Sequence, residues 1–66
     1  MTPRQLADLV AAHAPVLALF ARTWSDAPDD AVQDAFCRLA GLRTPPADPA
    51  AWLFAATRNA AIDRGR

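Results

Sequence analysis

Apolar side chains recur at intervals of three and four residues along the first third of the chain, which is the period of a helix with one buried face. The stripe comprises Leu6, Leu9, Val10, His13, Val16, Leu17, Phe20 and Trp24. A capping box precedes it, because the Thr2 hydroxyl can accept from the Gln5 amide while Gln5 reaches back, with Pro3 at the first helical position. The pattern predicts a helix over residues 3–24. Pro15 lacks an N–H and crowds the preceding turn, so we expect a kink or a split there.

A second helix is predicted from Ala27 or Pro28 to Gly41. Residues 25–30 combine a capping serine, a proline near the first turn and aspartates that favour a helix N-terminus, and the glycine supplies a stop. Its apolar face comprises Val32, Ala35, Phe36, Leu39 and Ala40. The opposite face carries Asp30, Gln33, Asp34, Cys37 and Arg38.

A third helix follows a stiff loop. Residues 42–48 contain two adjacent prolines, which lack donors and push the preceding residue into an extended conformation. Asp48 followed by Pro49 is again a cap and a first helical proline, and no helix breaker occurs before Asp63. We therefore expect a helix over about 49–64.

The predicted fold is all-α, a compact three-helix bundle formed as one domain by residues 1–66. Sixty-six residues suffice for a single small core, and no segment alternates apolar and polar residues as a half-buried strand does. At this size net stability rarely exceeds a few kcal/mol, so a partner is expected to be part of the normal state. The predicted core comprises Leu9, Leu17, Phe20, Val32, Phe36, Leu39, Leu53 and Ile62.

Charge is balanced overall and uneven along the chain. Seven arginines face seven aspartates, but residues 1–50 hold four Arg and six Asp whereas residues 51–66 hold three Arg and one Asp. Cys37 as the single cysteine excludes an intramolecular disulfide, and with His13 as the single histidine it cannot form a structural zinc site. No apolar run approaches 18 residues and no signal-peptide pattern opens the chain. We expect a cytoplasmic protein with no membrane partner, metal or other cofactor.

Enzymatic activity is not expected. A nucleophilic or metal-assisted mechanism needs a base held beside the reacting group, yet His13 lies on the predicted apolar stripe and Cys37 on the outer face of the second helix. The chain contains no Glu, Lys or Tyr. Most of its aspartates stand at helix starts, where capping explains them.

Two surfaces could bind partners. On the second helix Asp30, Gln33, Asp34 and Cys37 occupy positions i, i+3, i+4 and i+7, which form one stripe. The third helix begins with Trp52-Leu53-Phe54 and carries arginines toward its end, a combination that suits base stacking and phosphate contact on single strands. Solvated acids, core aromatics and arginines that complement the helix dipole are the alternative interpretations.

Together these segments resemble region 2 of bacterial sigma-70 family factors, specifically the extracytoplasmic-function group, along nearly all of the chain. Residues 30–39 read D-A-V-Q-D-A-F-C-R-L, similar to the family's D-x-V-Q-[DE]-x-F-x-[KR]-L. Residues 51–54 read A-W-L-F and residues 58–64 read R-N-A-A-I-D-R, similar to its A-W-L followed by R-N-x-A-I-D-x-x-R. The order of the two stretches is also that of the family.

The resemblance implies a sigma factor domain that binds core RNA polymerase and recognises and melts the promoter minus-ten element. The polymerase-binding stripe, docked on the clamp helices of the beta-prime subunit, would comprise Asp30, Gln33, Asp34 and Cys37. The DNA-binding set, which would hold the non-template single strand, would comprise Arg43, Trp52, Arg58, Asn59, Asp63, Arg64 and Arg66. Arginines can neutralise phosphates, and the Asn59 amide can pair with a base edge, unless it is buried and bonded to backbone. An anti-sigma factor is a further candidate partner.

The sequence also departs from the family. Many members have a longer loop with aromatic and glycine residues where this chain has residues 43–48, and the helix-turn-helix domain of region 4 is absent. We therefore expect an excised domain or a truncated relative. One alternative is a small all-helical protein-interaction module without DNA binding. A duplex-binding helix-turn-helix regulator ranks last, since the loop of about seven residues exceeds the three or four of that motif.

Overall fold

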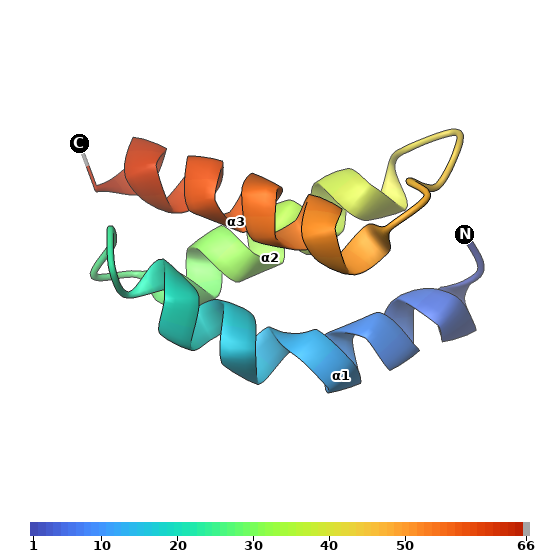
Figure 1. Cartoon of the computed structure of the whole chain (residues 1–66), viewed down its shortest axis with the longest axis horizontal. Coiled ribbons are helices and arrows are strands. Elements are labelled where there is room, and N and C mark those ends of the chain that lie inside the picture. The colour runs from blue at the N-terminus through green and yellow to red at the C-terminus, as the bar shows by residue number, and fades with distance from the viewer. Residues whose placement is uncertain (66) are drawn as a thin grey trace.

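The described part of the chain forms three helices, and they confirm the all-α fold. The computed structural model describes residues 1–65 and contains α1 (Pro3–Ala21), α2 (Pro28–Ala40) and α3 (Pro49–Arg64). α2 and α3 lie together on one side, and α1 lies across from them (Figure 1). The start of α1 and the loop between α2 and α3 share one end of the molecule, while the α1–α2 turn and the end of α3 share the other.

The predicted caps explain where the helices begin. Thr2 accepts from the Gln5 amide at 3.1 Å and donates its own amide to the Gln5 side chain at 2.9 Å, so the capping box is complete. Asp48 accepts from the amide of Ala51 at 3.1 Å. α2 differs, because Ser25 lies before its start and accepts from the Ala27 amide at 3.0 Å instead of capping the first turn.

α1 departs from its predicted bounds in two ways. It ends at Ala21 rather than at residue 24, because Thr23 and Trp24 form a turn in which the Trp24 amide donates to the Ala21 carbonyl. It also continues through Pro15 as one helix, so the predicted split is wrong. Pro15 is exposed, so water can reach the carbonyl that the missing N–H leaves without a donor.

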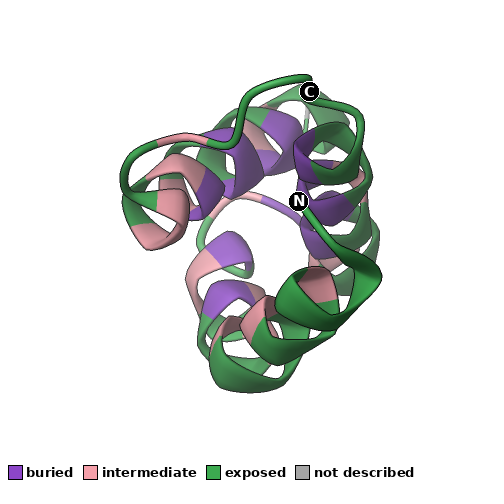
Figure 2. Ribbon diagram, turned by 90° about the vertical axis from the view of Figure 1, so that its right-hand side faces the viewer, coloured by how far each residue is buried: buried purple, intermediate pink, exposed green. Residues whose placement is uncertain are grey.

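The core lies between the three helices, whose buried sides face one another (Figure 2). Five of the predicted core residues are buried, namely Leu17, Val32, Phe36, Leu39 and Leu53. The other three are only half-buried, namely Leu9, Phe20 and Ile62. Ala35, which belongs to the predicted apolar face of the second helix, is buried as well. The sequence pattern did not indicate the other buried alanines, Ala21, Ala31, Ala56, Ala60 and Ala61. Small side chains therefore fill much of the contact between helices.

The predicted apolar stripes are wider than the buried surfaces. On α1 Val10 is 40% exposed and Val16 is 53% exposed, although both belong to the stripe. α1 covers the other helices with one narrow side centred on Leu17 and Ala21, so neighbours one step around the helix remain outside. Ala40, the last residue of α2, is also exposed although it belongs to the predicted apolar face.

Aromatic rings join α1 to α3. Phe20 contacts Trp24 edge to face with centroids 4.9 Å apart, and it contacts Phe54 of α3 in the same manner at 5.2 Å. The Arg58 guanidinium lies over the Trp24 ring, 5.7 Å from its centroid. Such contacts contribute beyond the burial of the rings themselves. The turn after α1 thus packs against α3 through the rings of Phe20 and Trp24.

Gly65 makes a second contact with that turn. A Cβ atom at Gly65 would collide with the backbone carbonyl of Trp24, whereas one at Gly41 would meet its nearest neighbours at 3.6 and 3.7 Å. The two glycines have nearly the same backbone conformation, with φ −82° and ψ −3° at Gly65 and φ −84° and ψ −7° at Gly41. The requirement for glycine at position 65 is therefore steric.

Phe36→Ala should lower the free energy of unfolding by roughly 3 to 5 kcal/mol, because a large buried ring is lost from the centre of a small core. Urea denaturation of the domain measures the change. Leu19→Ala is the control, since Leu19 is 64% exposed and should change stability by less than about 0.5 kcal/mol. A loss under about 1 kcal/mol for Phe36→Ala would show that the ring is not central to the core.

Gly65→Ala should destabilise the domain by about 1 to 3 kcal/mol, because the added methyl must displace the Trp24 backbone. Gly41→Ala is the matched variant, and it should be neutral or stabilising by up to about 1 kcal/mol through a less flexible unfolded chain. Thermal and urea denaturation compare the two. Equal effects of both substitutions would contradict the close contact at residue 65.

Candidate functional site

The outer side of α2 presents the predicted polymerase-binding stripe. Asp30, Gln33 and Cys37 are exposed, and Asp34 is half-buried. The opposite side of the same helix holds the buried residues Val32, Ala35, Phe36 and Leu39. The structure therefore brings the four polar positions together on a surface that the core does not use. Asp34 is turned partly toward α3.

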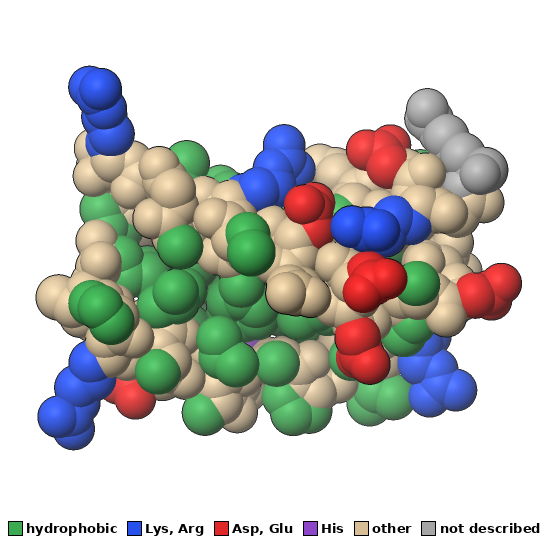
Figure 3. Space-filling view, turned by 180° about the vertical axis from the view of Figure 1, so that it is seen from behind, with side chains coloured by type: hydrophobic (Ala, Val, Ile, Leu, Met, Phe, Trp, Pro, Cys, Tyr) green, Lys and Arg blue, Asp and Glu red, His purple; other side chains and the backbone are tan. Residues whose placement is uncertain are grey.

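A groove runs between α2 and α3, and its charged end includes that aspartate. Asp34 and Arg38 of α2 and Asp63 and Arg64 of α3 line it, with Ala60 among them. Figure 3 shows acidic and basic side chains gathered over this end of the molecule. Asp34 of the predicted polymerase-binding stripe and Asp63 and Arg64 of the predicted DNA-binding set thus line the same cleft.

The other end of the groove is aromatic and apolar. Trp52, Ala55, Ala56 and Asn59 of α3 line it together with Arg38 and with Leu42, which follows α2. Arg38 lines both ends and therefore lies between them. Asn59 is exposed, so the alternative in which it is buried is wrong. Trp52 is half-buried and packs against the core with part of its ring.

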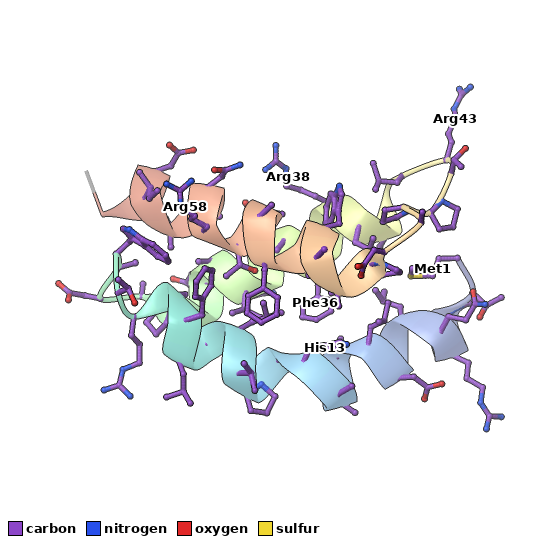
Figure 4. The ribbon with its side chains drawn as sticks, in the orientation of Figure 1. Met1, His13, Phe36, Arg38, Arg43 and Arg58 are labelled. Atoms are coloured by element: carbon purple, nitrogen blue, oxygen red, sulfur yellow. The ribbon has the colours of Figure 1, made fainter. Side chains whose placement is uncertain are left out.

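The remaining predicted DNA-binding residues lie elsewhere. Arg58 does not line the groove but lies over Trp24 on the side of α3 that faces α1. Arg43 projects from the loop before α3, at the opposite end of the molecule from Arg58 (Figure 4). Arg66 lies outside the described residues. Hence four of the seven predicted residues, Trp52, Asn59, Asp63 and Arg64, line one groove.

Sequence reasoning assigned Arg38 to the outer face of α2 and gave it no role. Its place in the groove depends on how α2 and α3 pack, because residues near Arg38 on α2 meet residues near Asn59 on α3. The seven-residue spacing of Trp52 and Asn59 does place both on one side of α3. A pattern within one helix cannot show which arginine of another helix faces that side.

Residues 1–65 offer neither a metal site nor a membrane-spanning helix. No group of three or more histidine, cysteine and acidic side chains is placed to hold a metal ion there. None of the three helices is both long enough and apolar enough to span a bilayer. The groove and the outer stripe of α2 are thus the candidate binding surfaces.

Comparison with known families agrees with the resemblance of the sequence. Residues 9–66 match the model of the family described as Sigma-70 region 2. The match begins within α1 and covers all of α2 and α3, and therefore every residue that lines the groove. Comparisons with curated proteins and with solved structures gave no match.

Proposed function

Because this chain belongs to the sigma-70 region 2 family, whose domains are non-enzymatic parts of transcription initiation factors, we propose that it binds core RNA polymerase and recognises and melts the promoter minus-ten element. We assign it to the extracytoplasmic-function group on its two sequence stretches, residues 30–39 and 51–64. Its place of action would be the cytoplasm, where polymerase works.

The outer stripe of α2 is the observation that supports binding to polymerase. Asp30, Gln33 and Cys37 are exposed on a helix whose other side is fixed in the core, so the stripe is held rigidly and needs no rearrangement to dock. Carboxylates with an amide suit a partner surface rich in arginine, and charge complementarity of this kind sets register and association rate. The clamp helices of the beta-prime subunit are the proposed partner.

The DNA half rests on the groove between α2 and α3. A base drawn out of the duplex loses stacking worth a few kcal/mol, and a site that offers an aromatic ring and a hydrogen-bonding amide offsets that loss. Trp52 and Asn59 supply these two groups in one cleft. The carboxylates at the charged end would repel a phosphate chain, so a short single-stranded segment suits the groove better than an intact duplex.

The second candidate is a protein-interaction module without DNA binding. It is favoured by the apolar side chains that α1 leaves in solvent, since Leu19 is 64% and Val16 is 53% exposed. Exposed apolar residues on a helix suit contact with another protein, and an anti-sigma factor would be one such partner. This candidate requires that the domain has no affinity for single-stranded DNA.

Replacing both Gln33 and Asp34 by alanine should reduce retention of bacterial core RNA polymerase on the immobilised domain about tenfold or more at physiological salt, because two polar contacts of the stripe are lost. Asp8→Ala, which removes an exposed carboxylate from α1, should leave retention unchanged. Circular dichroism establishes that each variant is folded. Equal retention by the double variant and the parent would contradict the docking assignment.

A further inference from the structure

We propose that Arg38 of α2 binds a phosphate of the single-stranded DNA whose base is held by Trp52 and Asn59. The inference rests on the proposed function and adds a contact that neither sequence stretch assigns to DNA. It makes α2 a helix with two partners, polymerase on its outer stripe and DNA at its edge with α3.

The geometry places the three side chains around one cleft. Trp52 and Asn59 stand two turns apart on the same side of α3. Arg38 lines the same cleft from α2, and Leu42 lines it from the segment that follows α2. A base stacked on the indole could therefore reach the Asn59 amide with its edge, while its phosphate remains at the rim beside the guanidinium. An arginine offers a phosphate two parallel hydrogen bonds as well as charge.

The floor of the groove is made of alanine, which leaves room for a flat ligand. Ala56 is 7% exposed and Ala60 is 5% exposed, and both line the groove. Larger side chains at these positions would fill the space between the helices. The polar side chains on the rim are all exposed or half-buried, so they can turn toward a ligand without being pulled from the core.

The distribution of charge decides where the phosphate binds. Among the described residues that line the aromatic end, Arg38 is the one ionisable side chain, so they carry a net positive charge. At the other end, the ionisable residues among the described lining residues, besides Arg38, are Asp34, Asp63 and Arg64, which leaves one net negative charge. An anion is therefore drawn to the aromatic end. The rival interpretation is that Arg38 interacts only with the carboxylate of Asp34, one turn earlier on the same helix, and does not bind DNA.

Arg38→Ala should weaken binding of short oligodeoxynucleotides of dT and dA about five- to tenfold. Fluorescence anisotropy of end-labelled strands at several salt concentrations measures this. The slope of log affinity against log salt should fall by about 0.7, the value for one phosphate contact on a single strand. Arg38→Lys should retain most of that slope, since it keeps the charge. Arg4→Ala, which removes an exposed arginine from the start of α1, should leave both quantities unchanged.

Asn59→Ala separates this inference from the proposed function. It should keep the salt slope and reduce the difference in affinity between dT and dA strands. If Asn59→Ala has that effect while Arg38→Ala binds DNA like Arg4→Ala, the Arg38 contact is wrong and DNA binding by the groove stands. If the parent binds neither strand, the inference and the DNA half of the proposed function both fail. Arg38→Ala should also retain core polymerase as the parent does, and a matching loss of polymerase would place Arg38 in the docking stripe instead.

Discussion

The packing of α3 through small side chains is the constraint on which the structure depends. Ala56, Ala60 and Ala61 are buried where α3 meets the other two helices, and only Leu53 among its buried residues is large and apolar. Alanine costs little side-chain entropy on burial and lets neighbouring helices approach. It also leaves no long side chain over the seam with α2, so the seam remains an open groove bordered by polar residues.

Alanine side chains make few contacts, and α3 is also held by larger contacts near each of its ends. Trp52, Leu53 and Phe54 join the main core near its start. Near its end, the ring of Trp24 lies under Arg58, and Gly65 abuts the Trp24 backbone. These contacts fix α3 against α1, while the groove residues face α2. The groove is consequently built on two held helices rather than on loops, which favours precise placement of its side chains.

The sequence was sufficient to predict the fold because its signals are local. Capping residues, prolines at first helical positions and Gly41 predict the helix bounds to within a few residues, and the buried leucines follow from helical spacing. The spacing could not show that α1 buries a narrow side, which leaves Val10 and Val16 in solvent. The spacing also could not show which of the many alanines are buried, because alanine is common on both faces of a helix and its burial depends on the neighbouring helices.

The site was predictable in part for the same reason. Asp30, Gln33 and Cys37 share one side of a single helix, and Trp52 and Asn59 share one side of another, so their grouping follows from helical geometry. The groove is formed by two helices in contact, and the position of Arg38 in it could not be read from either alone. Arg58 belongs to the predicted DNA-binding set, but its guanidinium lies over the ring of Trp24, on the side of α3 that faces α1. Trp24 is distant in the sequence, so this contact could not be predicted from α3 alone.

The central claim is that polymerase binds the outer stripe of α2 and that DNA binds the aromatic end of the groove, two surfaces that adjoin along α2. Two-dimensional NMR of the ¹⁵N-labelled domain tests it most directly, by titration first with the isolated clamp helices of the beta-prime subunit and then with a single-stranded oligodeoxynucleotide. The account predicts that the clamp helices shift the backbone signals of Asp30, Gln33 and Cys37, and that DNA shifts the Trp52 indole and Asn59 side-chain signals. Shifts of one common set of residues by both ligands would contradict it.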